Sequence, residues 1–192
     1  MILDENYWNK RYLNQQTGWD IGFASTPLVA YAQQIQDKNI AILIPGCGNA
    51  YEAIFLAENG FKHITVLDIA PILVEVLQEK CKNYPQIQVL HQDFFLHSGN
   101  YDLILEQTFF CAISPTQRGN YAKKMYELLK NEGKLVGVLF DRDFENSPPF
   151  GGSAEEYRHY FEPYFTFKVF EPCRNSIAPR AGSELFMILQ KK

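Results

Sequence analysis

The chain has 192 residues, of which 46% are hydrophobic and 21% are charged, and this composition suits one globular domain with a full core. Eighteen basic residues against 22 acidic ones, with no dense run of Lys and Arg, argue against nucleic acid as a partner. No apolar run approaches the roughly 20 residues that span a bilayer, and the start MILDENYWNK lacks the basic and apolar regions of a secretory signal. We therefore expect a single cytoplasmic, monomeric domain over residues 1–192 that binds no membrane.

The sequence does not predict a metal site. The four cysteines are widely spaced and form no CxxC pair, so neither a zinc site nor a disulfide framework is indicated. His91 and His97 flank Asp93, but three potential ligands near a strand end arise easily by chance. We expect no bound metal.

Strand-like and helix-like segments alternate along the chain, which is typical of a doubly wound α/β sheet. The predicted strands of this part are Asn39–Ile44, His63–Asp68, Ile87–His91, Tyr101–Glu106 and Lys134–Phe140. The predicted helices between them are Tyr51–Asn59, which Gly60 would end, a second begun by Pro71, and a third opened by Ser114 as N-cap with Pro115 behind it and running to about Lys130.

The regular alternation of predicted strands and helices ends after Phe140. A loop over Asp141–Ser153 precedes a predicted helix, Ala154–Phe161, and two strands, Phe165–Phe170 and Glu184–Leu189. These two strands suit an antiparallel hairpin at one edge of the sheet. The prediction is therefore a seven-stranded, mostly parallel, Rossmann-like sheet with an antiparallel C-terminal hairpin, the arrangement of class I methyltransferases.

The 38 residues before the first predicted strand hold two amphipathic stretches, around Tyr7–Leu13 and Leu28–Ile35, and both tryptophans of the chain, Trp8 and Trp19. We expect this segment, residues 1–38, to pack over the carboxyl edge of the sheet as a lid on a cofactor.

A glycine loop, Gly46-Cys47-Gly48, stands where the first strand ends and a helix begins, the place at which open α/β sheets bind ligands. Glycine permits positive φ and close approach of a ligand to the backbone. Asp68 ends the second strand 20 positions after Gly48, where a carboxylate reaches a ribose hydroxyl. The alternative role for Asp68 is to cap the following helix.

Tyr51 indicates which of two classes of ligand, a dinucleotide or a single nucleoside, the glycine loop fits. A dinucleotide fingerprint needs a small residue at its sixth position so that helix and strand pack closely, and counting from Gly46 that position is Tyr51. The ring favours a single nucleoside without pyrophosphate.

Two further strand ends carry candidate residues. Asp93-Phe94 could hold an adenine, with the carboxylate accepting from its amine and the ring stacking on its face, although a capping Asp beside a core Phe is the alternative. Glu106-Gln107 follows the fourth strand, and Phe109-Phe110 would form an apolar wall beside the reacting centre unless the two rings only fill the core.

With these residues in view, the chain resembles the thiopurine S-methyltransferase family, and within it the plant halide/thiol methyltransferases most closely. The resemblance runs from about Trp8 to Phe186 and is most specific over YDLILEQTFFCAISPTQRGNYAKKMYELL, Tyr101–Leu129. Further matching motifs are TGWDIGFASTPL, LIPGCGNAYE, VLDIA and PPF.

The resemblance implies S-adenosylmethionine as cofactor and methyl transfer to a thiol, hydrosulfide or halide. The residues that it implies for the cofactor are Trp8, Tyr12, Trp19, Gly46, Gly48, Asp68, Ile69, Asp93, Phe94 and Gln107. Two positions depart from the family pattern. Tyr12 stands where a second Trp is usual, and Gln107 stands where plant enzymes have Tyr and thiopurine enzymes have Arg, so the resemblance does not select one acceptor among these.

No residue is assigned as a general base, because a thiol with a pKa near about 8.5 already ionises appreciably at neutral pH. The acceptor-side candidates are Glu106, Gln107, Phe110 and Arg180. Three alternatives remain open at this point: a methyltransferase with a small nitrogen or oxygen acceptor, a nicotinamide-dependent oxidoreductase, and a non-catalytic binding module of the same fold.

Overall fold

Five apolar runs form the parallel part of one seven-stranded sheet in this computed structural model, which describes residues 2–192. In spatial order these strands are β3 (Ile87–His91), β2 (His63–Asp68), β1 (Ala41–Pro45), β4 (Tyr101–Gln107) and β5 (Leu129–Phe140). In β1 every residue from Ile42 to Pro45 is buried, as expected for a parallel strand that is covered on both faces. The chain winds outward in both directions from the β1–β4 pair, so a switch point lies between them.

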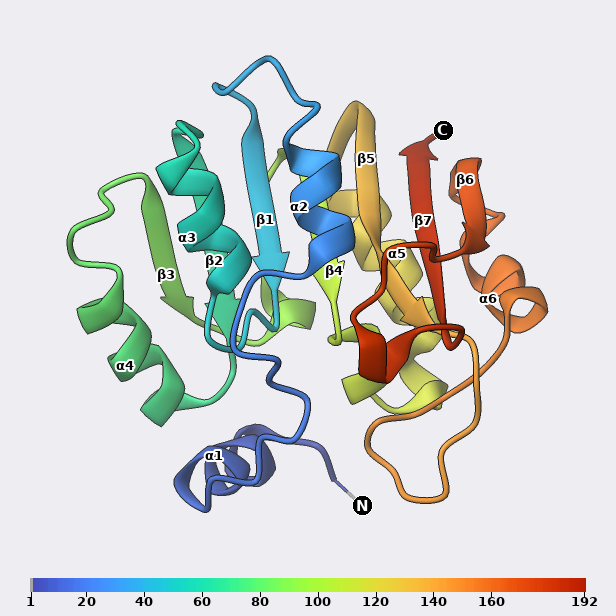
Figure 1. Cartoon of the computed structure of the whole chain (residues 1–192), viewed down its shortest axis with the longest axis horizontal. Helices are drawn as coiled ribbons and strands as arrows, with labels where there is room; N and C mark the ends of the chain where they lie inside the picture. The colour runs from blue at the N-terminus through green and yellow to red at the C-terminus, as the bar shows by residue number, and fades with distance from the viewer. Residues whose placement is uncertain (1) are drawn as a thin grey trace.

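The C-terminal strands complete the sheet in antiparallel sense. They are β6 (Phe165–Pro172) and β7 (Glu184–Lys191), in the full order β3-β2-β1-β4-β5-β7-β6. β7 pairs with both β5 and β6, so β6 forms the edge (Figure 1). The predicted fold class, with its terminal hairpin, is confirmed.

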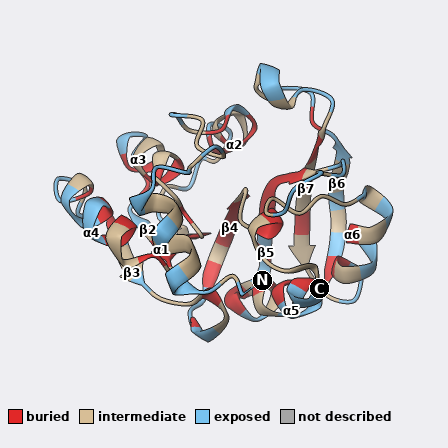
Figure 2. Cartoon of the chain, turned by 90° about the horizontal axis from the view of Figure 1, so that it is seen from below, coloured by how far each residue is buried: buried red, intermediate tan, exposed pale blue. Residues whose placement is uncertain are grey.

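Helices cover both faces of the sheet. On one face lie α2 (Thr26–Ala32), α3 (Tyr51–Glu58) and α4 (Pro71–Lys80), and on the other lie α5 (Arg118–Leu128) and α6 (Ala154–Phe161). Each face has its own hydrophobic cluster, and Leu56 and Met125, one in each cluster, are fully buried. Figure 2 shows the buried residues concentrated in the central strands.

The first helix, α1 (Glu5–Leu13), belongs to neither layer. It lies beyond the carboxyl ends of the parallel strands and packs against α4 (Figure 1). Asp4 caps it by accepting from the amide of Tyr7 at 2.9 Å, and Asn9 accepts from the amide of Ile72 at 3.0 Å. None of its residues is fully buried, so local capping and a few links to α4 hold it in place.

The region before β5 corrects one expectation. Ser114 makes no capping bond and instead pairs with the hydroxyl of Thr116, and a short 3-10 turn, Pro115–Gln117, precedes α5. The helix ends at Leu128 and β5 begins at once, five residues before the predicted start at Lys134, and Lys130 of this early part forms an ion pair of 2.8 Å with Asp102 of the neighbouring strand. The remaining predicted boundaries agree within a few residues.

The turn after β4 is organised by a buried carboxylate. Glu106 has 0% exposure, and its Oε1 accepts from the amides of Phe109 at 2.8 Å and Phe110 at 2.9 Å. Its Oε2 accepts from the hydroxyl of Tyr121 in α5. Burial raises the pKa of Glu106 from its ordinary 4.5 to about 7, although these hydrogen bonds offset part of the effect.

Replacing this carboxyl by its neutral isostere, Glu106→Gln, should flatten the pH dependence of stability between about pH 4.5 and 7. The folded pKa of about 7 lies above the ordinary value of 4.5, so the folded chain binds the proton more tightly than the unfolded chain does. The free energy of unfolding of the parent therefore falls as pH rises through this window, by on the order of 3 kcal/mol. Urea unfolding at a series of pH values measures it.

The matched control is Glu127→Gln, which changes an exposed glutamate of the same helix that bears Tyr121. Its slope should equal that of the parent. Equal slopes in Glu106→Gln and the parent would show that Glu106 does not titrate in this range.

Candidate functional site

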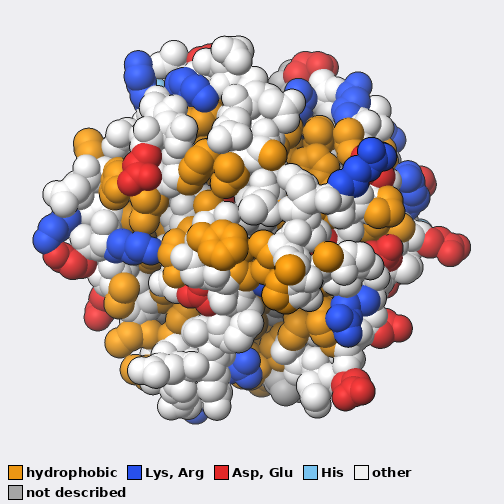
Figure 3. Space-filling model, viewed as in Figure 1, with side chains coloured by type: hydrophobic (Ala, Val, Ile, Leu, Met, Phe, Trp, Pro, Cys, Tyr) orange, Lys and Arg blue, Asp and Glu red, His pale blue; other side chains and the backbone are white. Residues whose placement is uncertain are grey.

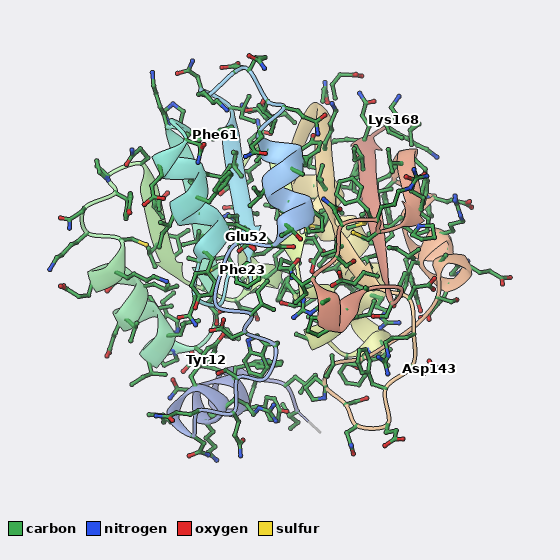
Figure 4. All side chains as sticks on the ribbon, in the orientation of Figure 1. Tyr12, Phe23, Glu52, Phe61, Asp143 and Lys168 are labelled. Atoms are coloured by element: carbon green, nitrogen blue, oxygen red, sulfur yellow. The ribbon has the colours of Figure 1, made fainter. Side chains whose placement is uncertain are left out.

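A cavity of about 460 Å³ opens at the carboxyl ends of β1, β2 and β4, at the switch point of the sheet. This volume lies in the range of roughly 300–1,000 Å³ that small-molecule sites occupy. The strand ends, the N-terminal segment, the turn after β4 and the loop after β5 all contribute to its walls. Figure 3 shows apolar side chains gathered near the centre of one face, and Figure 4 labels Phe23, a half-exposed ring of the cavity lining, near the centre of the same view.

The glycine loop forms the floor of the cavity. Gly46 has φ +56° and Gly48 has φ +50°, both in the left-handed region. A Cβ atom on Gly46 would lie 2.2 Å from the ring of Phe109, so no other residue fits beneath that ring. Both glycines therefore serve the turn, and Gly46 also permits the close approach of Phe109.

Asp68 lies at the end of β2, directly beside this loop. It is 7% exposed, and its Oδ1 accepts from the amide of Ala70 at 3.0 Å. Burial raises its pKa to about 6, while amides of Ala70, Gly48 and Ile69 act in the opposite direction. The helix α4 begins after Ala70 without a side-chain cap, so Asp68 braces the turn rather than capping the helix. Both Asp68 and Ile69 line the cavity.

Asp93 and Phe94 also line the cavity. Asp93 accepts from the amide of Phe95 at 2.8 Å and so caps a short 3-10 turn, Phe94–Leu96. Phe94 packs edge-on against Phe109 at 5.2 Å between ring centroids. The capping role and the place in the cavity wall are thus both present, and Phe95, which the sequence did not single out, lies in the same wall.

Three rings of the N-terminal segment cover the cavity. Trp19 contacts Trp8 and Tyr12 edge-on, at centroid distances of 5.6 and 5.8 Å, and the guanidinium of Arg11 lies 5.4 Å from the Trp19 ring. Tyr12 projects from α1 (Figure 4) with its hydroxyl close to Gly48. Burial and the nearby charge of Asp68 raise the pKa of Tyr12.

Gln107, the last residue of β4, borders the same cavity. Its Oε1 is shielded from solvent and accepts no hydrogen bond from residues 2–192. A buried acceptor without a donor costs about 1–3 kcal/mol, so a ligand that supplies a donor would be favoured here.

Three acceptor-side candidates lie outside the cavity lining. Glu106 is buried beneath it as described above. Phe110 is 1% exposed and packs against Tyr121 and Tyr157, because the turn sends it to the opposite side from Phe109. Arg180 donates to the main-chain carbonyl of Trp19 at 2.8 Å. The expectation that Phe110 belongs to the aromatic wall is wrong.

Several lining residues escaped the sequence analysis. Asp20 bonds to the side chain of Asn49, and Glu52, buried in α3, accepts from the amide of Ser25 at 2.8 Å. These pairs join the N-terminal segment to the start of α3 across long stretches of chain. Their motifs, TGWD and GCGNAYE, were visible in the sequence, but nothing in them indicated that the two would touch.

The loop after β5 closes the remaining side. Its Pro148 and Pro149 line the cavity. Arg118, 1% exposed, holds the loop by donating to the carbonyl of Gly151 at 2.7 Å and pairing with Glu156 at 2.6 Å.

The charged side chains that line the cavity are acidic. Five carboxylates contribute to it, and within residues 2–192 no Lys, Arg or His does; the five are Asp4, Asp20, Glu52, Asp68 and Asp93. Such a wall attracts a cation and repels a pyrophosphate, which speaks against the nicotinamide alternative. Across the described chain we find no group of three or more His, Cys, Asp or Glu side chains placed to hold a metal, and no helix with the length and apolarity to cross a membrane.

Comparisons with known proteins identify relatives of the chain. A probable thiol methyltransferase of Arabidopsis thaliana is 33% identical, with 95% of this chain and 85% of that protein covered. A thiocyanate methyltransferase of Brassica oleracea is 32% identical, covering 95% of this chain and 83% of that one.

Among solved structures, the 1,6-didemethyltoxoflavin-N1-methyltransferase of Burkholderia thailandensis, with bound S-adenosylhomocysteine, superposes with a TM-score of 0.78 at 17% identity over 98% of this chain and 87% of that chain. This likeness concerns the fold. The sequence model of the thiopurine S-methyltransferase family matches residues 3–186. The chain therefore belongs to the thiopurine S-methyltransferase family and is an S-adenosylmethionine-dependent methyltransferase.

Proposed function

We propose that this enzyme transfers a methyl group from S-adenosylmethionine to a small soft nucleophile, a thiol or hydrosulfide, inside the cavity at the switch point. The observation that carries the proposal is Asp68, a buried carboxylate beside a left-handed glycine loop in a wall without basic side chains. The relatives described above, a probable thiol methyltransferase and a thiocyanate methyltransferase, support a soft acceptor.

The residues present fit the cofactor. Asp68 would accept from the ribose hydroxyls, and Asp93 with Phe94 would hold the adenine. The remaining contacts would come from Gly46, Gly48, Ile69 and Gln107, with Trp8, Tyr12 and Trp19 as the cover, all of which line the cavity. The acidic wall suits a ligand that carries positive charge. We also propose that the segment through residue 38 acts as a lid on this site.

The bound cofactor supplies a methyl group on a positively charged sulfur. The rings of Trp8, Trp19 and Phe109 exclude water, and this strengthens the attraction between a soft anion and that charge. Ring faces stabilise a cation by roughly 0.5–2 kcal/mol each. Positioning of the acceptor by the cavity walls supplies alignment for an in-line displacement.

We assign the acceptor to the part of the cavity between the end of β4 and the loop after β5. Gln107, Ser114 and Gln117 line it together with Pro148 and Pro149. Burial raises the pKa of the nearby Cys111 thiol to about 12, so this thiol is neither a base nor a nucleophile at neutral pH. An acceptor that ionises by itself, as a thiol does, needs no base here. A nitrogen or oxygen acceptor is the second candidate, and the acceptor assay separates the two.

A two-step assay tests the proposal. S-adenosylhomocysteine, and not NADH, should raise the melting temperature of the protein. Initial rates with S-adenosylmethionine should then be higher for hydrosulfide and small thiols than for iodide, phenols and amines. No shift with S-adenosylhomocysteine would refute the cofactor site, and faster methylation of phenols or amines would refute the soft acceptor.

Asp68→Ala should weaken binding of S-adenosylhomocysteine by about 1–3 kcal/mol, because charge-assisted hydrogen bonds to the ribose are lost. Its pKa of about 6 adds a second signature: affinity in the parent should fall below that pH, as the carboxylate protonates, and the variant should lose this dependence. Calorimetry measures both.

Glu75→Ala, at an exposed carboxylate of α4, is the control and should bind as the parent does. If Asp68→Ala binds as tightly as this control at neutral pH, the ribose assignment is wrong.

Gln107→Tyr should raise methylation of iodide relative to methylation of a small thiol. Gln offers a donor and an acceptor but no aromatic face, whereas Tyr would add a ring to the wall beside the acceptor. The readout is the ratio of kcat/KM for the two acceptors within one protein, in which changes of cofactor affinity largely cancel. Gln117→Tyr, at another glutamine of the cavity lining, is the comparison variant. An unchanged ratio in Gln107→Tyr would remove Gln107 from acceptor choice.

A further inference from the structure

The loop between β6 and β7 reaches back to the N-terminal segment through Arg180. This residue ends a 3-10 turn, Ala178–Arg180, and its side chain is 11% exposed. Its Nη2 donates to the carbonyl of Trp19 at 2.8 Å, a contact across 161 positions of sequence. We propose that Arg180 is a positioning residue that latches Trp19 over the cofactor and takes no part in acceptor binding; this inference rests on the proposed cofactor site.

The guanidinium also contacts the sheet. Glu184, the first residue of β7, has a side chain that is 5% exposed and lies 3.5 Å from Nη1, and the ring of Phe140 at the end of β5 lies 5.4 Å from Cζ. The main-chain carbonyl of Arg180 accepts from the amide and the hydroxyl of Ser183. The planar guanidinium can donate to Glu184 with one nitrogen and to the carbonyl of Trp19 with the other, whereas a lysine ammonium has a single nitrogen.

Holding the carbonyl of Trp19 also places its ring. The ring lines the cavity and contacts Trp8 and Tyr12, the other two rings of the cover. A second bond runs between the same two segments, from the hydroxyl of Thr26 to the carbonyl of Asn175 at 2.6 Å. Figure 1 shows the loop between β6 and β7 at the same end of the sheet as the N-terminal segment. The loop and the cavity cover therefore form one unit.

The geometry separates this role from acceptor binding. Arg180 lies outside the cavity lining, and its nitrogens face Glu184 and Trp19. Loss of the latch should therefore change cofactor affinity, whereas an acceptor-binding arginine would change the KM of the acceptor.

The test compares Arg180→Met with Arg174→Met, a control in the same loop whose side chain is 85% exposed and pairs only at the surface with Glu171. Calorimetry should show S-adenosylhomocysteine binding about tenfold more weakly in Arg180→Met, as expected for loss of one charge-assisted hydrogen bond. The KM for S-adenosylmethionine should rise in parallel. The acceptor KM and kcat at saturating cofactor should stay within about twofold of the parent.

Two further readouts do not depend on turnover. Proteolytic cleavage within residues 5–20 should be faster in Arg180→Met than in the control without ligand, and S-adenosylhomocysteine should protect it less. Fluorescence of the two tryptophans, both of which lie in the cover, should respond less to the ligand. Arg180→Lys, which keeps a charge beside Glu184, should recover most of the melting temperature while its cofactor affinity stays about threefold or more below the parent.

Three results would overturn the latch. Unchanged cofactor affinity in Arg180→Met refutes it, and a raised acceptor KM at unchanged cofactor affinity returns Arg180 to the acceptor. Full recovery of affinity together with stability in Arg180→Lys shows a structural role only. If Arg180→Met does not fold, Arg180→Lys decides the question by the same affinity measurement. A parent protein that binds no S-adenosylhomocysteine refutes the proposed function instead.

Discussion

The buried carboxylate of Glu106 is the constraint on which the site depends. Its two oxygens bind two successive amides of the turn after β4 and the hydroxyl of Tyr121 from the layer behind the sheet. This fixes a tight turn in which Phe109 faces the cavity and the next residue, Phe110, enters the core. The ring of Phe109 then rests on Gly46, where a side chain would collide. An acidic group at 0% exposure is costly unless hydrogen-bonded, and here the bonds that reduce this cost also shape the floor of the cavity.

The second constraint is the negative charge of the side chains that line the cavity. Carboxylates gather at its wall, which within residues 2–192 has no Lys, Arg or His in its lining, and burial raises the pKa of Asp68 and of Glu52. Folding without a ligand therefore brings poorly compensated acidic groups together, and a bound molecule with positive charge and hydroxyl donors would relieve them. Stability and ligand binding are coupled through the same side chains. The core lies on the two faces of the sheet, away from this edge, so it tolerates an unfavourable charge pattern there.

The cover of the cavity is held by segments from three parts of the chain. α1 is anchored to α4 by Asn9, the stretch from Trp19 to Ser25 is tied to α3 through Asp20 and Glu52, and Arg180 adds a link from the loop before β7. No residue of α1 is fully buried, so polar links carry much of the attachment. Such an arrangement permits local opening at a small free energy, which is what a cover over a site for small molecules requires.

The sequence by itself determined the succession of strands and helices along the chain, the glycine loop and the residues at the strand ends. Alternating apolar runs, Gly46 with Gly48 and the position of Asp68 are local signals, and parallel strands bring their carboxyl ends to one edge of the sheet. It also predicted α6 with the bounds that the structure has. Only the tertiary structure decided which neighbour faces the cavity and which enters the core, as Phe109 and Phe110 show. Tyr121, which donates to Glu106, lies 15 positions from it, and Trp19, which accepts from Arg180, lies 161 positions from it. No periodicity of the sequence indicates contacts of this kind. Such contacts depend on how the turns close and on which buried polar groups must be satisfied, and these are set by packing of the whole chain.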